Sequence, residues 1–215
     1  PGGDGAFTAV ANGGSFHCAS SQNGWTNRVI PGSSPQQYAR IDPQGGTGYL
    51  FVNPFVLDPN NSNIMYFAGG NYAWRNSDIT AIPIGNGTPT SINWTRMDNS
   101  AVTGQTQVSA LAVLKANPTN RLYVARSPQG YLQRVDNANT GDPVGVDIGA
   151  AIPTGFISSV AVNPTDGNKV FVVFSNYSLA SLWYSSDAGA TWADVEGNLA
   201  GANGPSCRSV TIVPI

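Results

Sequence analysis

The chain has 215 residues and a formal net charge of −2, and only 10% of its residues are Asp, Glu, Lys or Arg. Singly scattered Arg and Lys argue against a nucleic-acid surface, and no apolar run approaches the roughly 18 residues of a membrane span. The 25 glycines and 15 prolines, with few charged helix formers, predict an all-β protein rich in tight turns.

A strand–turn–strand pattern recurs along the chain. Each copy is an apolar strand, a turn rich in Pro, Asn, Asp or Gly, and an alternating strand that carries an aromatic residue. The copies span residues 7–19, 56–68, 113–125 and 160–172, and their aromatic markers are Phe16, Tyr66, Tyr123 and Phe171. The spacing of about fifty residues is the length of one four-stranded blade of a β-propeller.

Each copy continues into a third and a fourth strand, predicted at 72–75 and 92–97 in the second unit and at 181–185 and 192–196 in the last. The predicted blades are approximately 1–43, 44–103, 104–152 and 153–203, and residues 204–215 begin a fifth blade with its innermost strand. Because uncapped sheet edges are avoided, we expect a larger propeller, completed by missing blades or by another chain.

The segment between the last two predicted strands has the pattern Ser-x-Asp-x-Gly-x-Thr-Trp, formed by Ser185, Asp187, Gly189, Thr191 and Trp192. A short carboxylate can accept backbone N–H groups within its own turn, and glycine adopts positive φ without steric cost. The tryptophan ring can fill the space between strands. This pattern resembles the Asp-box (BNR repeat) of sialidase-like β-propellers, and it predicts a structural turn.

The opening Gly2–Phe7 segment and the phrase from Pro54 to Asn60 are similar to the repeats of xyloglucanase-like and sortilin-like (VPS10) propellers. The resemblance covers nearly the whole chain and implies four-stranded antiparallel blades. This superfamily contains hydrolases, sorting receptors, assembly factors and secreted repeat proteins, so the fold does not choose among them.

Successive connections in a four-stranded meander alternate between two faces of the blade. The turns between second and third strands share one face, the mouth face, with the inter-blade crossings, and the Asp-box turn lies on the other. Each of these mouth turns pairs an amide with an aromatic residue: Asn23 with Trp25, Asn71 with Tyr72, Gln129 with Tyr131, and Asn176 with Tyr177. Such pairs suit neutral sugar rings. The simpler interpretation is that the amides form the turns and the rings pack between blades.

In xyloglucanase-like hydrolases a Gly-Asp step at the start of a blade carries a catalytic carboxylate, so the resemblance implies Asp4 as a candidate acid or base. Glycoside hydrolysis usually needs two carboxylates about 5–10 Å apart. Asp42 is the nearest second candidate, although Asp-Pro is also a common turn. Non-catalytic members share the same strand start. His17 is the only histidine, no metal-ligand or phosphate-binding pattern is present, and no cofactor is predicted.

Low charge and abundant Asn, Ser and Thr fit a secreted or cell-surface protein. Cys18 and Cys207 are the only cysteines, and they either form a disulfide that closes nearly the whole chain or remain free thiols. The expected role is a non-catalytic scaffold that recognises glycans or protein through its mouth. The alternative is part of a xyloglucanase-like glycoside hydrolase that uses Asp4.

Overall fold

The computed structural model describes residues 3–115, 118–127, 129–199 and 204–213. Gly2 of the opening motif, Ala116 and Asn117 in the turn of the third repeat, and the last two residues of the predicted fifth-blade segment lie outside the described residues. Within the described part of the chain, no helix has the length and apolar character needed to cross a membrane.

The protein folds into four antiparallel sheets of four strands, and within each sheet the strands pair in chain order. We call these sheets blades 1 to 4. Their strands are β1 Gly5–Val10, β2 His17–Ser21, β3 Thr26–Ile30 and β4 Gln37–Arg40; β5 Phe55–Leu57, β6 Met65–Gly69, β7 Tyr72–Asn76 and β8 Trp94–Met97; β9 Gln107–Val113, β10 Leu122–Ser127, β11 Tyr131–Val135 and β12 Val146–Asp147; and β13 Ile157–Val162, β14 Val170–Phe174, β15 Leu182–Ser185 and β16 Ala193–Asp194. Short 3₁₀ turns occur at η1 Asn12–Gly14, η2 Ile79–Ala81, η3 Asp98–Ser100 and η4 Gly197–Leu199.

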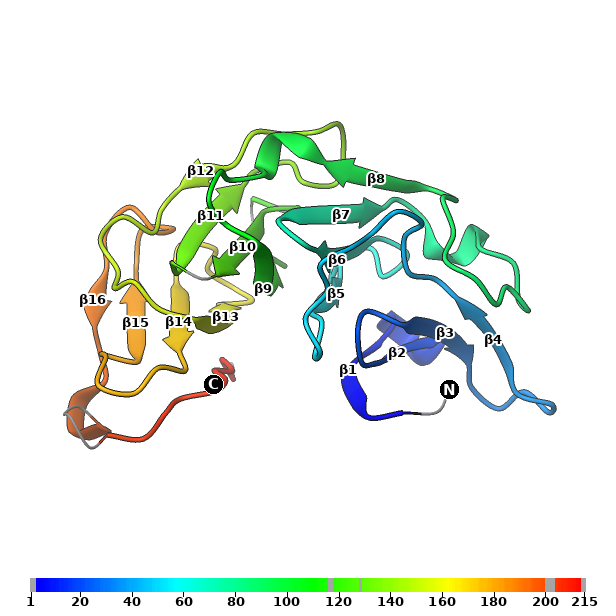
Figure 1. Cartoon of the computed structure of the whole chain (residues 1–215), viewed down its shortest axis with the longest axis horizontal. Helices are drawn as coiled ribbons and strands as arrows, with labels where there is room; N and C mark the ends of the chain where they lie inside the picture. The colour runs from blue at the N-terminus through cyan, green and yellow to red at the C-terminus, as the bar shows by residue number, and fades with distance from the viewer. Residues whose placement is uncertain (1–2, 116–117, 128, 200–203, 214–215) are drawn as a thin grey trace.

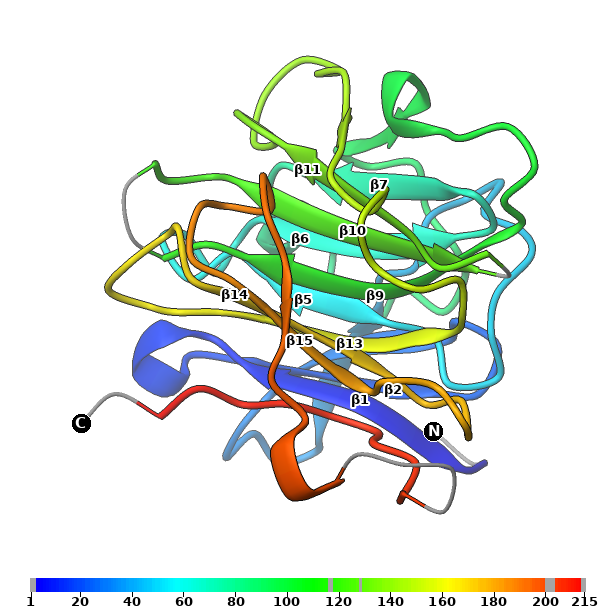
Figure 2. The ribbon, with the colours of Figure 1, turned by 90° about the vertical axis from the view of Figure 1, so that its left-hand side faces the viewer.

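The blades lie side by side in an open arc, with the first strand of each blade nearest the centre and the fourth on the outside (Figure 1). Viewed from the side, β5, β9 and β13 follow one another around the inner surface of the arc (Figure 2). The prediction of an all-β propeller built from four-stranded blades is therefore confirmed.

Strand register aligns the blades residue by residue. Arg28, Arg75 and Arg134 occupy equivalent places on the third strands and pair with Cys18, Tyr66 and Tyr123 on the second strands. In blade 4 the same row pairs Phe171 with Tyr184. The choice of Phe16 as the marker of the first blade was therefore wrong. Phe16 precedes β2, and the equivalent position belongs to Cys18, because the Gly13–Gly14 turn shifts the spacing.

The hydrophobic core is divided among the boundaries between consecutive blades. One buried cluster contains Phe16 and Phe67 from blades 1 and 2, another contains Tyr66 and Val124 from blades 2 and 3, and a third joins blades 3 and 4. The second strands of blades 2 and 3, β6 and β10, are buried along their whole length, so β6 and the Leu122–Ala125 part of β10 read as apolar runs with little alternation.

An arginine on the third strand of one blade holds the next blade at every boundary. Its guanidinium donates to carbonyls in the loop that precedes the fourth strand of that next blade: Arg28 to Ile82 (2.7 Å), Arg75 to Ala138 and Gly141 (both 2.9 Å), and Arg134 to Ala188 (3.3 Å). Burial lowers the pKa of Arg28 and of Arg75 from the usual arginine value. The arginine N–H groups thus act as donors to loop carbonyls that would otherwise be buried without a hydrogen bond.

A tryptophan supplies a second connection at two boundaries. It belongs to the later blade and donates to the preceding one, whereas the arginines donate from the earlier blade to the next. The indole N–H of Trp94 donates to the Ile41 carbonyl (2.8 Å), and that of Trp192 donates to the Ile148 carbonyl (2.7 Å). Each acceptor directly follows the fourth strand of the preceding blade. The rings therefore close the outer part of these boundaries.

The boundary between blades 2 and 3 lacks this tryptophan, because the equivalent place before Val146 is Gly145. A buried arginine on β10, Arg126, connects blades 2 and 3 at this boundary. Its fully buried guanidinium donates to the Asn71 carbonyl (3.0 Å), to Gln133 Oε1 (2.7 Å) and to the Ser100 carbonyl. Burial lowers the pKa of Arg126 to about 10.

Residues 204–213 form no strand, so the prediction that they make the innermost strand of a fifth blade is wrong as a statement of secondary structure. The segment nevertheless lies beside blade 4. The Ser206 hydroxyl donates to the Ser175 carbonyl (2.7 Å), and the Val210 N–H donates to Ser159 Oγ on β13 (3.3 Å). A strand needs a backbone ladder, and the described residues provide no second strand for this one.

Replacing Trp192 by Phe should lower the free energy of unfolding by about 1–2 kcal/mol, because the Ile148 carbonyl loses its donor while most of the ring's apolar contact is retained. Chemical denaturation would measure the difference. Trp25→Phe is the matched control, since that ring is 43% exposed and its replacement should change stability by less than about 0.5 kcal/mol. Equal effects of both substitutions would contradict the role of the indole hydrogen bond.

Candidate functional site

The Ser185–Trp192 turn uses its polar groups on itself. Asp187 accepts the Thr191 N–H at Oδ1 (2.8 Å) and the Thr191 hydroxyl at Oδ2 (2.6 Å). The Ser185 hydroxyl donates to Asp187 Oδ1 (2.8 Å) and accepts the Gly189 N–H (2.8 Å). The hydrogen bond from the Thr191 hydroxyl, followed by those from the Thr191 N–H and Ser185, lowers the pKa of Asp187 to about 2. This carboxylate is therefore engaged in holding the turn.

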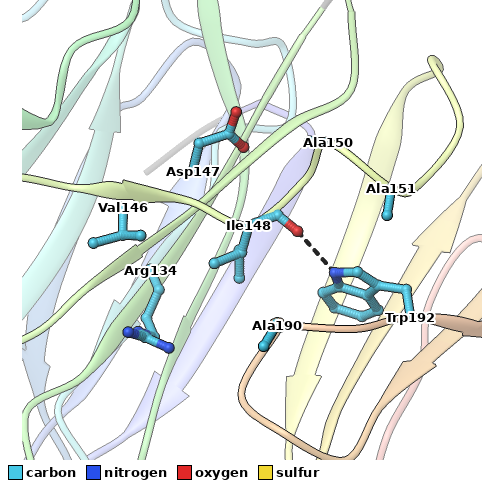
Figure 3. Close-up of a pocket in the computed structure, with 9 residues that line it drawn as sticks. Arg134, Val146, Asp147, Ile148, Ala150, Ala151, Ala190 and Trp192 are labelled. Carbon is cyan, nitrogen blue, oxygen red and sulfur yellow. Dashed lines mark hydrogen bonds between the residues drawn. The ribbon is translucent and has the colours of Figure 1, made fainter.

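Gly189 lets this turn pack against blade 3. Its φ is +94°, and a Cβ placed there would lie 2.5 Å from Ile148 Cδ1. A cavity of about 290 Å³ lies beside this contact, between β12 and the turn, and its wall includes Arg134, Asp147 and Trp192. The Trp192–Ile148 hydrogen bond lies in the wall of this cavity (Figure 3). Arg134 donates to the Ala188 carbonyl and forms a salt bridge with Asp136.

The turn should make stability acid-sensitive. The folded-state pKa of Asp187 is depressed, so its ionised form stabilises the fold above the usual aspartate pKa of about 4. That contribution is lost as pH falls through about 2. Melting temperatures recorded between pH 5 and pH 2 should fall less steeply for Asp187→Asn than for the wild type. Asp194→Asn is a control on the adjacent strand, and identical pH profiles for all three proteins would contradict this assignment.

The amides predicted at the mouth hold their turns against the inter-blade crossings. Asn71 Nδ2 donates to the Val102 carbonyl (2.7 Å), and Gln129 Oε1 accepts from Gln105 (2.9 Å). Asn176 Oδ1 accepts the Phe156 N–H (2.6 Å). Asn23 adopts a φ of 57°, and its N–H donates to the Phe51 carbonyl. These contacts favour the structural interpretation of the amides.

The aromatic partners of these amides differ in exposure. The Arg40 guanidinium lies 3.9 Å from the ring centroid of Trp25, and that of Arg96 lies 4.3 Å from the centroid of Tyr72. Tyr131 is half-buried, and burial raises its pKa. Tyr177 is 71% exposed. Trp25 remains 43% exposed although the Arg40 guanidinium lies over its ring, so Trp25 and Tyr177 are the predicted rings most accessible to a ligand.

The two candidate carboxylates differ in their surroundings. Asp42 is buried and receives two hydrogen bonds from Arg40, at 2.8 and 3.0 Å. Asp4 is exposed and makes no hydrogen bond to another described residue through its carboxylate. In the part of the chain that the structure describes, no three His, Cys, Asp or Glu side chains gather as metal ligands.

Both cysteines are free thiols, which is the second of the two alternatives left open by the sequence. Cys18 is fully buried in the core between blades 1 and 2, and burial raises the pKa of its thiol to about 12. Cys207 lies in the C-terminal segment and is partly exposed.

The inner surface of the arc contains a cavity of about 420 Å³ that the sequence did not indicate. Its wall is formed by Phe7, Leu50, Phe51, Val52, Ser109, Phe156, Ser158 and Arg208. None of the eight residues predicted for the mouth contributes to it. The sequence feature that could have indicated this cavity is a phenylalanine in the opening strand or shortly before an innermost strand, at Phe7, Phe51 and Phe156. No motif surrounds these phenylalanines, so the sequence does not distinguish them from residues of the hydrophobic core.

Comparison with known proteins finds likeness among solved structures but not among sequences. No protein-family profile matches the sequence, and no curated protein of similar sequence was found. Among solved structures, a GH74 enzyme from Niastella koreensis matches with 15% sequence identity and a TM-score of 0.44, over 88% of this chain and 38% of that one. The protein described here thus spans well under half of that enzyme's length. Its assignment as a propeller of four-stranded blades rests on its own sheets.

Proposed function

We propose that this chain is part of an Asp-box propeller that serves as a secreted or cell-surface, non-catalytic scaffold and recognises glycans through its mouth face. The exposure of Trp25 and Tyr177 beside mouth turns held by hydrogen bonds carries the proposal. Exposed rings on a rigid support can stack on sugar faces with little loss of conformational entropy. The engagement of Asp42 with Arg40 argues against a hydrolytic pair.

The hydrogen bonds within the Ser185–Trp192 turn support the Asp-box resemblance. They join Thr191 to the Asp187 carboxylate and Gly189 to the Ser185 hydroxyl, as expected of a motif that stabilises its own turn. Trp192 then packs against the preceding blade. A protein partner at the same mouth face is the second form of recognition that this scaffold would support.

Further blades are expected to cover both ends of the arc. Tyr184 occupies the place of the boundary arginine in blade 4, and Val195, 39% exposed, follows the fourth strand as Ile41 and Ile148 do. In blade 1, Tyr38 stands at the tryptophan position and is 48% exposed. These boundary positions have no neighbouring blade among the described residues, so we propose that missing blades or another chain complete the ring.

Affinity electrophoresis through gels containing neutral β-glucans or xyloglucan tests glycan recognition. The wild type should be retarded, and Trp25→Ala and Tyr177→Ala should each weaken binding by about fivefold, since one stacking contact contributes about 1 kcal/mol. Tyr38→Ala is the matched control, because Tyr38 is an exposed aromatic residue on β4 and belongs to none of the mouth turns. Loss of retardation in the control alone, or no retardation of the wild type, would contradict a glycan site at the mouth.

The same polysaccharides separate the scaffold from the hydrolase. We expect no release of reducing ends during prolonged incubation with the 215-residue protein. Release of reducing ends that Asp4→Ala abolishes would overturn the scaffold and establish the hydrolytic alternative.

A further inference from the structure

The 420 Å³ cavity at the inner surface of the arc, here called the axial cavity, concentrates exposed apolar residues. Phe7, Phe51 and Val52 are 38%, 55% and 48% exposed, and all three lie in its wall. Large apolar side chains that are exposed singly are common on protein surfaces, but their convergence in one concave site is typical of ligand pockets. Leu50 and the half-buried Phe156 extend the same apolar wall.

Three residues of the axial cavity lie at irregularities in innermost strands. Ser109 is the unpaired residue between Val108 and Ala110 in β9, and Ser158 is the unpaired residue between Ile157 and Ser159 in β13. Phe7 lies in the register shift between Gly5 and Thr8 in β1. A β-bulge redirects a side chain out of the regular alternation. Irregular strand register in blades 1, 3 and 4 therefore places side chains in the wall of the axial cavity.

Ser109 carries an unused hydrogen-bonding group. Its side chain is buried, at 7% exposure, and its Oγ has no hydrogen-bond partner among the described residues. A buried hydroxyl without a partner costs free energy, so the Ser109 hydroxyl in the cavity wall is available to hydrogen-bond a polar atom of a ligand.

Arg208 places one cation at the axial cavity. It is exposed and makes no ion pair or hydrogen bond with another described residue. The Ser158 hydroxyl lies 3.4 Å from the Cys207 carbonyl, so the bulge in β13 also anchors the segment that carries Arg208. No carboxylate is present among the eight lining residues.

We propose that the axial cavity binds a small aromatic monocarboxylate. The phenylalanine and aliphatic walls would enclose an apolar, planar body, the Arg208 guanidinium would pair with the carboxylate, and the Ser109 hydroxyl would donate to one of its oxygens. A neutral sugar fits less well, since it would leave Arg208 without a partner and would place many hydroxyl groups against apolar walls. This site is distinct from the mouth rings proposed to bind glycans.

Isothermal titration calorimetry of the 215-residue protein with phenylacetate tests the proposal. Benzyl alcohol, which lacks the charge, and acetate, which lacks the ring, serve as comparison ligands. Phenylacetate should bind saturably at one site per chain, and each comparison ligand should bind at least about tenfold more weakly, because each retains only one of the two kinds of contact.

Single substitutions then assign the roles. Arg208→Gln should weaken phenylacetate binding by about tenfold and leave benzyl alcohol binding unchanged. Phe51→Ala should weaken the binding of both aromatic ligands. Ser109→Ala should weaken phenylacetate binding severalfold without lowering the melting temperature, because the hydroxyl has no partner within the protein.

Lys169→Gln is the matched control. It removes an exposed cation just before β14, and it should leave phenylacetate binding unchanged. Absence of saturable phenylacetate binding, equal affinity for benzyl alcohol, or equal effects of Arg208→Gln and Lys169→Gln would each overturn the proposal. Glycan retardation uses Trp25 and Tyr177 and is measured separately, so either proposal can fail while the other stands.

Discussion

The buried carbonyl groups at the blade boundaries are the constraint on which this architecture depends. Stacking sheets face to face buries the loops between third and fourth strands, and those loops have carbonyls that no sheet ladder satisfies. Arg28, Arg75 and Arg134 supply long, branched donors that reach from one blade to the next. Apolar packing drives the stacking, whereas these donors help to determine which loop meets which strand.

The boundary between blades 2 and 3 shows how one missing side chain alters the surrounding polar contacts. Gly145 leaves no indole there, and the Met97 carbonyl accepts the Ser100 hydroxyl instead. Arg126 connects three residues, Asn71, Ser100 and Gln133, and none of its acceptors is a carboxylate. A fully buried guanidinium of this kind is stable only when carbonyl and amide oxygens replace its hydration shell.

The repeat and the Ser185–Trp192 pattern were enough to predict the class of fold, because blade length and turn chemistry are local properties. Register was harder to predict. Phe16 appeared to be the marker of blade 1, but two glycines in the turn moved that position to Cys18. The axial cavity could not be predicted, because its walls come from bulges and crossings distant in sequence, brought together only when the blades stack. The composition of segment 204–213 is typical of a strand. A strand also needs a pairing partner, which strand propensity does not reveal.

The division of the core among the blade boundaries makes this protein a quasi-one-dimensional array. Blades 2 and 3 each share an apolar boundary on both sides, whereas blades 1 and 4 each share one within this chain. Local unfolding should therefore begin at blades 1 and 4 and proceed toward blades 2 and 3. Cooperativity in such an array is set by nearest neighbours, so an additional unit at either end would slow the fraying of every unit behind it.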